Sequence, residues 1–203
     1  MMPWLRYCPL ALLMLIGACS SPTLRYHTLS APPTEELPVK PPAAFYLSIA
    51  PVGVPPQLDQ TPLVVRQGTG GALVLENDRW LSPFGEEIRA ALAAALVNRL
   101  NARDVSGLAE RTDVKPVIRI HLQVRRFDAW PGQRVIFSGD WSLSTLRAGT
   151  RVQLLCTSRF NQPAPGGYPD LLQAQQKIIA RLAEQIATHV DRWAPGYRGD
   201  CVE

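Results

Sequence analysis

The sequence predicts an α+β fold in which an antiparallel sheet packs on two long helices within a single domain. Three observations support this prediction. Two long segments repeat apolar residues at helical spacing, and three consecutive segments after residue 117 alternate apolar with polar residues. Glycine- or proline-containing turns separate those three segments, so we expect them to form a meander. An N-terminal strand and a hairpin complete the predicted sheet.

The first helix is predicted to begin at Ser82-Pro83, because serine caps free amides and proline fits the first helical position. The second runs from near Asp170 to Trp193 and ends before Pro195-Gly196. The first apolar stripe comprises Phe84, Ile88, Leu92, Leu96 and Leu100, and the second Leu171, Ile178, Leu182, Ile186 and Val190. Both stripes should cover one sheet face, leaving the other face open.

The strands are predicted from alternation. Residues 45–49 form the first, and residues 63–66 and 72–75 flank the glycine-rich residues 68–71 as a hairpin. The meander follows as residues 118–125, 135–143 and 152–156, joined by turns at 130–132 and 148–149.

The N-terminus has the composition of a secretory signal. Residues 7–18 are uncharged, and 12 residues span about 18 Å as a helix, which is too short for roughly 30 Å of bilayer hydrocarbon. Ile16-Gly17-Ala18-Cys19 resembles the bacterial lipobox, which predicts lipidation of Cys19. The competing interpretation is an ordinary signal with a chance cysteine. Ser20 after Cys19 favours the outer membrane, by resemblance to lipoprotein sorting in enteric bacteria.

Three regions follow from these signals. Residues 1–18 are predicted to be a lipoprotein signal peptide, residues 19–44 a lipidated, proline-rich tether, and residues 45–203 the folded domain. Inside the tether, residues 25–29 are expected to dock as a short strand.

The remaining cysteines and the charges narrow the classes of function. Cys156 and Cys201 predict a disulfide closing a 45-residue loop, since no Cys-x-x-Cys is present and the histidines lack ligand spacing. A redox or metal site is the weaker alternative. The 18 arginines and 3 lysines are dispersed among 17 acidic residues, so we expect no nucleic-acid partner, and no motif calls for a cofactor.

No catalytic constellation is evident in the sequence. Asp128 and Asp140 flank a turn and suggest a carboxylate pair, but ordinary turn acids are the favoured interpretation. The best interaction candidate is the outward row of the first meander strand, formed by Arg119, His121, Gln123 and Arg125, which suits an acidic partner or lipid headgroups. A plain solvated sheet face is the alternative.

With these residues placed, the chain resembles the ABC-type transport auxiliary lipoproteins, the PqiC group. The resemblance rests on short motifs in order along the mature chain: Cys19-Ser-Ser, Tyr26-His-Thr-Leu29, Val52-Gly-Val-Pro55, Asn77-Asp-Arg-Trp80, Val135-Ile-Phe-Ser-Gly139 and Gly166-Gly-Tyr168. The Cys156–Cys201 pair and the loop at residues 161–165 depart from the family pattern.

The resemblance implies a non-enzymatic outer-membrane lipoprotein, facing the periplasm, that serves an MCE-type (mammalian cell entry) lipid transport system. Its implied partners are an MCE-domain membrane protein and further copies of itself in a homo-oligomeric ring. Two alternatives stay open: a stand-alone structural envelope lipoprotein that moves no lipid, and a membrane-tethered periplasmic hydrolase.

Overall fold

The computed structural model describes residues 23–31, 41–108, 115–193 and 201. Its elements, in chain order, are β1 Arg25–His27, β2 Tyr46–Ile49, β3 Pro62–Gln67, β4 Gly71–Trp80, α2 Phe84–Leu100, β5 Arg103–Asp104, β6 Val117–Trp130, β7 Arg134–Arg147, β8 Thr150–Pro163 and α3 Tyr168–Trp193. The predicted α+β fold with two long helices is confirmed. No helix in this part of the chain is both long and apolar enough to cross a membrane.

The strands form two sheets. The larger has the order β5-β2-β6-β7-β8, and the smaller has the order β1-β4-β3. The β6–β8 meander and the β3–β4 hairpin are antiparallel, as predicted. However, β2 pairs in parallel with both β5 and β6, and β1 pairs in parallel with β4. The prediction of one antiparallel sheet was therefore wrong in these pairings. Alternation shows which side chains are buried, but it carries no information on strand direction.

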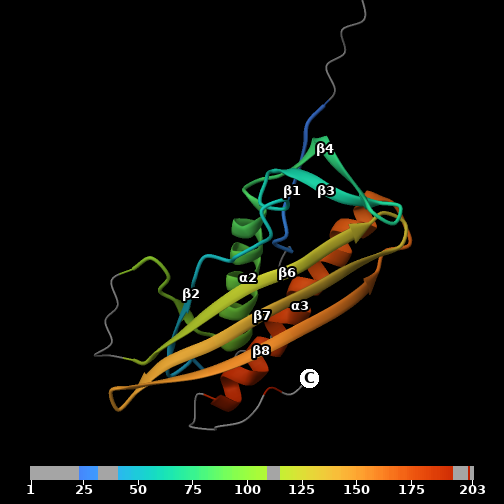
Figure 1. Cartoon of the computed structure of the whole chain (residues 1–203). Coiled ribbons are helices and arrows are strands. Elements are labelled where there is room, and N and C mark those ends of the chain that lie inside the picture. The colour runs from blue at the N-terminus through green and yellow to red at the C-terminus, as the bar shows by residue number, and fades with distance from the viewer. Residues whose placement is uncertain (1–22, 32–40, 109–114, 194–200, 202–203) are drawn as a thin grey trace, which may run out of the picture.

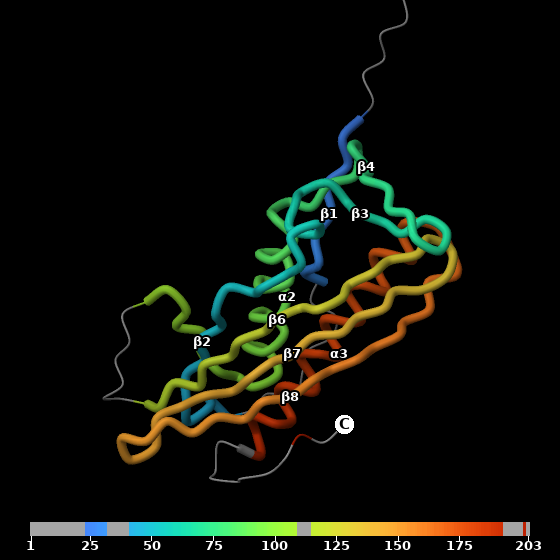
Figure 2. Tube along the Cα trace, viewed as in Figure 1, coloured from blue at the N-terminus to red at the C-terminus, as the bar shows by residue number. Residues whose placement is uncertain are grey.

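Helices α2 and α3 lie together behind the larger sheet and cover one of its faces (Figure 1). The same view as a tube shows the smaller sheet at one end of the molecule, beside the end of β6 (Figure 2). All ten residues of the two predicted apolar stripes are buried, which confirms both stripes. An aromatic series crosses the core between helix and sheet, with Phe127 contacting both Phe84 and Phe137 at ring-centroid distances of 5.2 and 5.4 Å.

The start of α2 differs from the prediction. Pro83 is the N-cap residue, and no side chain caps the helix. Ser82 instead donates its hydroxyl hydrogen to Oε1 of Glu87, at 2.8 Å. The predicted capping role of Ser82 is therefore wrong, because this hydroxyl bonds to a carboxylate in the helix rather than to a free amide.

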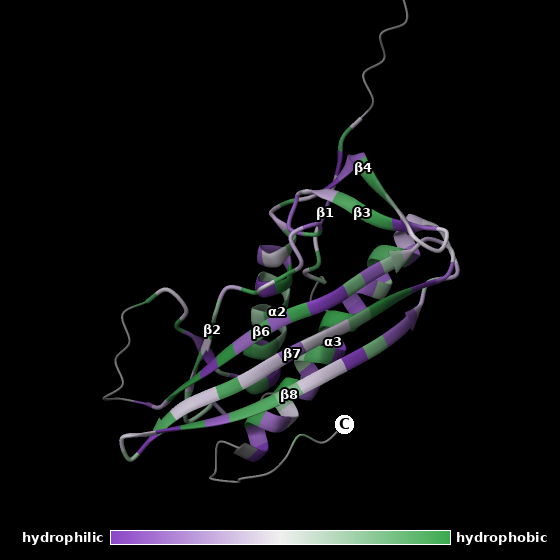
Figure 3. Ribbon diagram, in the orientation of Figure 1, coloured by the Kyte–Doolittle hydropathy of each residue, from purple (hydrophilic) through white to green (hydrophobic). Residues whose placement is uncertain are grey.

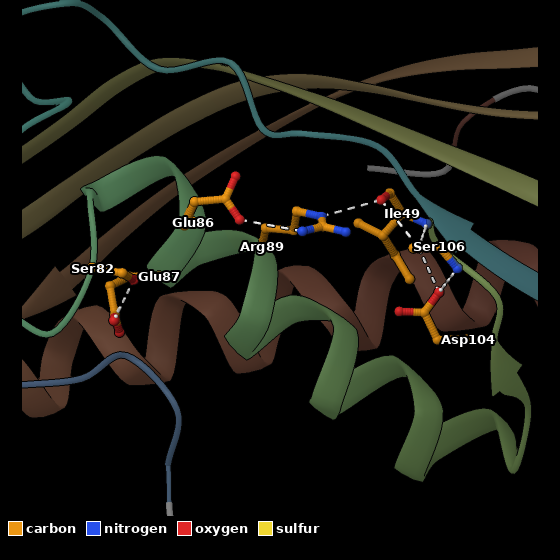
Figure 4. A network of polar contacts seen from close by, with 7 residues as sticks. All are labelled: Ile49, Ser82, Glu86, Glu87, Arg89, Asp104 and Ser106. Carbon is orange, nitrogen blue, oxygen red and sulfur yellow. Dashed lines mark hydrogen bonds and ion pairs between the residues drawn. The ribbon is translucent and has the colours of Figure 1, made fainter. Parts of the chain in front are cut away.

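A second polar network fixes α2 against the end of β2 (Figure 4). Arg89 of α2 donates from Nε to the carbonyl of Ile49, at 3.3 Å, and pairs with Glu86. The Ile49 amide donates to Oγ of Ser106, at 2.7 Å, and that hydroxyl lies 2.5 Å from Asp104. These bonds satisfy the backbone amide and carbonyl of Ile49, where β2 ends.

Strand β6 changes phase along its length. Ile118, Ile120, Leu122 and Val124 face the helices, but the pairing with β7 shifts between Val124 and Arg126. After the shift, Phe127 and Ala129 are the buried apolar residues. Such an irregularity inserts one extra residue and redirects side chains. It places Arg125 and Arg126, although consecutive, on the same outward face.

Candidate functional site

The face of β6, β7 and β8 opposite the helices, here called the open face, carries the predicted interaction row. His121, Gln123 and Arg125 are exposed there, and Arg119 is half-buried. Their inward neighbours on β6 are buried apolar residues, so strand alternation holds the row outward. The row thus lies on one strand face, as predicted. Figure 3 shows polar segments along these strands.

Arg125 is part of a cross-strand network on the open face. Its Nε donates to Oδ2 of Asp140 on β7, at 2.8 Å, and Thr157 of β8 donates to Oδ1 of the same carboxylate, also at 2.8 Å. The hydrogen bond from Arg125 is the main reason that the pKa of Asp140 lies below its ordinary value, and the bond from Thr157 adds to it. The network joins three strands and keeps Asp140 ionised.

Asp128 and Asp140 do not form a catalytic carboxylate pair. Asp128 lies opposite Ile136 and Asp140 lies opposite Gln123, so the two carboxylates do not face each other across the strands. Asp128 is buried and accepts hydrogen bonds from Arg126 and from Arg66 of β3, the latter at 2.7 Å. Each acid is matched by arginine, and the Arg66–Asp128 bond ties the smaller sheet to β6.

The middle of the open face is formed by small side chains. Ser138, Ser142 and Ser144 point outward from β7, where Ser142 and Ser144 are buried between longer side chains of β6 and β8. Arg151 and Arg159 are exposed on β8. Among the described residues, no three His, Cys, Asp or Glu side chains lie close enough together to hold a metal ion. The arrangement offers hydrogen-bonding and cationic groups to a partner surface.

A second feature, which the sequence interpretation only partly anticipated, is the docking of the N-terminal strand. The predicted short strand within residues 25–29 is confirmed as β1, which pairs with residues 78–80 of β4. Arg25 binds both carboxylate oxygens of Asp78, at 2.8 and 2.6 Å, and Nε2 of His27 lies 2.9 Å from Oδ1. Chiefly through the Arg25 bond, the pKa of Asp78 is held below its ordinary value.

Directly after β1, the chain is hydrogen-bonded to the buried carboxylate of Glu87. Its Oε2 accepts from the Thr28 hydroxyl at 2.8 Å and from the Leu29 amide at 3.0 Å, in addition to the bond from Ser82. The Leu29 side chain is buried in the core, and Gln176 of α3 donates to the Thr28 carbonyl at 3.0 Å. Glu87 is thus a binding group for the N-terminal segment. The sequence showed it only as an acidic residue early in a helix.

The cysteine predictions fall in two parts of the chain. Cys19 and the predicted signal peptide, residues 1–18, lie outside the described residues. Cys156 of β8 and Cys201 are joined by a disulfide in the structure, with their Cα atoms 5.6 Å apart. The bond attaches the residue at position 201 to the strand that forms one edge of the larger sheet.

Comparisons with known proteins identify the family to which this chain belongs. The model of the family described as ABC-type transport auxiliary lipoprotein component matches residues 27–187, and the chain belongs to that family. A search among curated proteins found no match. Family membership makes the chain part of a transport system and associates it with the cell envelope.

Two solved structures share the fold. One, described as an uncharacterized protein, is 20% identical, with a TM-score of 0.59 over 83% of this chain and 99% of its own. The other, from Xanthomonas campestris, is 14% identical, with a TM-score of 0.53 over 83% of this chain and 92% of its own. At these identities the likeness concerns the fold alone.

Proposed function

We propose that this chain is a lipid-anchored, non-enzymatic auxiliary subunit of an MCE-type lipid transport system, held at the periplasmic face of the outer membrane. The observation that carries the proposal is the family match over residues 27–187, which begins at the last residue of β1 and includes most of α3. The predicted signal peptide and Cys19 supply the anchor. A binding function is also supported by the pairing of Asp140 on the open face with Arg125 and of the buried Asp128 with Arg66, which leaves neither acid poised for catalysis.

The open face is the proposed contact surface for the MCE-domain partner. Arg119, His121, Gln123 and Arg125 form its first strand, and Arg151 and Arg159 extend the positive charge to β8. An arginine buried at an interface contributes strongly to the free energy of binding when its guanidinium forms two hydrogen bonds with a carboxylate of the partner. The partner surface is therefore expected to be acidic.

Co-purification from gently solubilised membranes tests this function. The acylated protein should recover an MCE-domain membrane protein, and Arg125→Glu should reduce that recovery. Lys177→Glu is the matched control, because it makes the same charge change at an exposed position on α3. Within the described part of the chain, the Lys177 ammonium donates only to the side chain of Gln173, so the loss of this bond should leave the fold intact. His121→Glu provides a second open-face variant if the loss of the Arg125–Asp140 bond prevents folding.

Three results would count against the proposal. Recovery of no MCE-domain protein by the wild-type chain would contradict the transport assignment. Equal recovery by Arg125→Glu, His121→Glu and Lys177→Glu would contradict the open face as the contact. Deletion of the gene with normal lipid exchange between the membranes would favour a structural envelope lipoprotein.

The homo-oligomeric ring is part of the same proposal. Strand β8 is the last strand of the larger sheet, and edge strands offer unpaired backbone groups to another chain. Native mass spectrometry of the acylated protein in detergent should show a closed oligomer. A monomer at all concentrations would remove the ring from the proposal.

A further inference from the structure

The smaller sheet exposes an apolar surface that neither the helices nor the larger sheet covers. Of the nine large hydrophobic side chains exposed in the described residues, five lie directly before β1, on β1, on β4 or directly after β4. They are Leu24, Tyr26, Leu73, Val74 and Leu81, with exposed fractions of 45%, 58%, 44%, 40% and 65%. Leu73 and Val74 are consecutive on β4 and project from opposite faces of the sheet, so the name β1–β4 apolar surface is kept for Leu24, Tyr26 and Leu81.

The strand pairing brings the members of this surface together. Tyr26 is the register partner of Arg79, so both side chains project from the same side of the sheet, and Leu24 projects there two residues earlier. Leu81 follows Arg79 by two positions, and its amide donates to the His27 carbonyl at 3.0 Å. Two leucines and a tyrosine therefore lie near Arg79, whose guanidinium also pairs with the exposed Glu76 at 3.6 Å. Figure 3 shows apolar segments at the start of β1 and along β4.

The length of chain before β1 indicates what this surface meets. Thr23, the first described residue, is four residues after Cys19, and four extended residues span at most about 14 Å. A lipid on Cys19 holds that residue at the bilayer surface. The strand that follows is fixed to the domain through Asp78 and Glu87, so the domain cannot move away from the membrane by releasing more chain.

We propose that the β1–β4 apolar surface lies against the lipid bilayer and orients the domain on the membrane; this inference rests on the proposed lipid anchor. Leucine side chains enter the acyl boundary, and tyrosine and arginine suit the headgroup region, where an aromatic ring and a cation are both favoured. The surface is too small to bind a membrane strongly by itself. Held there by the anchor, it selects one orientation among many.

Quenching of tryptophan fluorescence by brominated lipid tests the orientation. The chain from Cys19 onward is coupled through the Cys19 thiol to a maleimide lipid in vesicles of phosphatidylethanolamine, phosphatidylglycerol and a brominated phosphatidylcholine. The other two cysteines of this chain are bonded to each other. Tyr26→Trp reports on the surface. Leu155→Trp is the control, since Leu155 is 71% exposed but lies on β8.

The Tyr26→Trp variant should lose more fluorescence than the wild type in brominated vesicles, while Leu155→Trp should lose no more than the wild type. Adding Leu24→Ser and Leu81→Ser to Tyr26→Trp should reverse the extra loss. Leu24→Trp serves in the same way if Tyr26→Trp does not fold. Equal quenching of the two reporters, or quenching of Leu155→Trp alone, would overturn the proposal.

The same measurement separates other occupants and the anchor itself. If a second copy or a protein partner covers the surface, the Tyr26→Trp signal will not respond to brominated lipid, and the proposal fails. Chemical coupling holds the chain on the vesicle whether or not a cell acylates Cys19. An unmodified Cys19 in the protein isolated from cells would therefore contradict the anchor, and the quenching result would remain a measurement of the surface alone.

Discussion

Replacement of Glu87 by alanine should release the N-terminal segment from the domain. The Glu87 carboxylate accepts hydrogen bonds from the Leu29 amide and from the hydroxyls of Thr28 and Ser82, at 2.8–3.0 Å. The buried amide is left without its charged acceptor, which costs about 1.5–3 kcal/mol, and each hydroxyl adds about 1 kcal/mol. We therefore expect Glu87→Ala to lower the free energy of unfolding by about 3.5–5 kcal/mol.

Urea denaturation followed by circular dichroism measures that loss, and limited trypsin digestion locates it. Arg25 lies within β1, where pairing with β4 and the bond to Asp78 protect the following peptide bond. In Glu87→Ala, cleavage after Arg25 should become faster, as seen by mass spectrometry. Locating the effect in this segment distinguishes local release from a general loss of stability.

Glu86→Ala is the matched control. Glu86 is the neighbouring residue of the same helix, but it is exposed and pairs with Arg89 at 3.2 Å. An exposed pair of this kind contributes about 0.2–1 kcal/mol, so Glu86→Ala should leave both the denaturation midpoint and the trypsin pattern close to wild type. If Glu87→Ala behaves like Glu86→Ala in both assays, the carboxylate does not hold the segment and the reasoning is refuted.

Three further measurements address other parts of the fold. Because the pKa of Asp78 is lowered, its ion pair stabilises the fold fully above the unfolded-state pKa of about 3.9, and this stabilisation is lost as the pH falls through the lowered pKa. Asp78→Asn should therefore flatten the dependence of the free energy of unfolding on pH in that acidic range, and an unchanged slope would contradict this. Replacing Cys156 and Cys201 with serine should lower the free energy of unfolding by about 4 kcal/mol, from the entropy of a 45-residue loop, and equal urea midpoints would show that the bond adds nothing. Trp141→Phe removes the indole bond to Ser158, at 2.8 Å, and should cost about 1 kcal/mol in thermal unfolding, whereas a gain in stability would exclude a net contribution from that bond.

The helices and the meander were predictable because their signals are local. Apolar residues every four positions in α2 and α3, and every second position in β6 to β8, identify the buried faces without knowledge of the partner element. The shift in β6 was not predicted, although the sequence carries a signal for it. Spacing by two changes to spacing by three between Val124 and Phe127, with two arginines between them, which is the pattern that a bulge leaves.

The parallel pairings and the polar contacts of the N-terminal strand were not predictable in the same way. Strand β1 has three residues, too few for a pattern, and its partner lies about fifty positions later in the chain. Nothing local in the sequence marks Asp78 or Glu87 as buried, because Arg25 lies on that distant strand and Thr28 and Leu29 directly follow it. Burial of an acid becomes visible only when the non-local donors are placed around it.

The position of β1 shows that the proline-rich residues do not separate the domain from the proposed lipid anchor. Prolines 32, 33, 38, 41 and 42 follow β1 in the sequence, and they suggested a spacer between membrane and domain. Both ends of that stretch meet the same domain, because Leu29 is buried in the core and the Ala43 amide donates to the Asn101 carbonyl at 3.0 Å. A chain whose two ends are fixed to one body adds no distance between that body and the membrane. If Cys19 carries the proposed lipid, only residues 20–22 separate it from the described chain, so under that proposal the distance that the protein extends from the membrane is set by the length of the domain and not by its prolines.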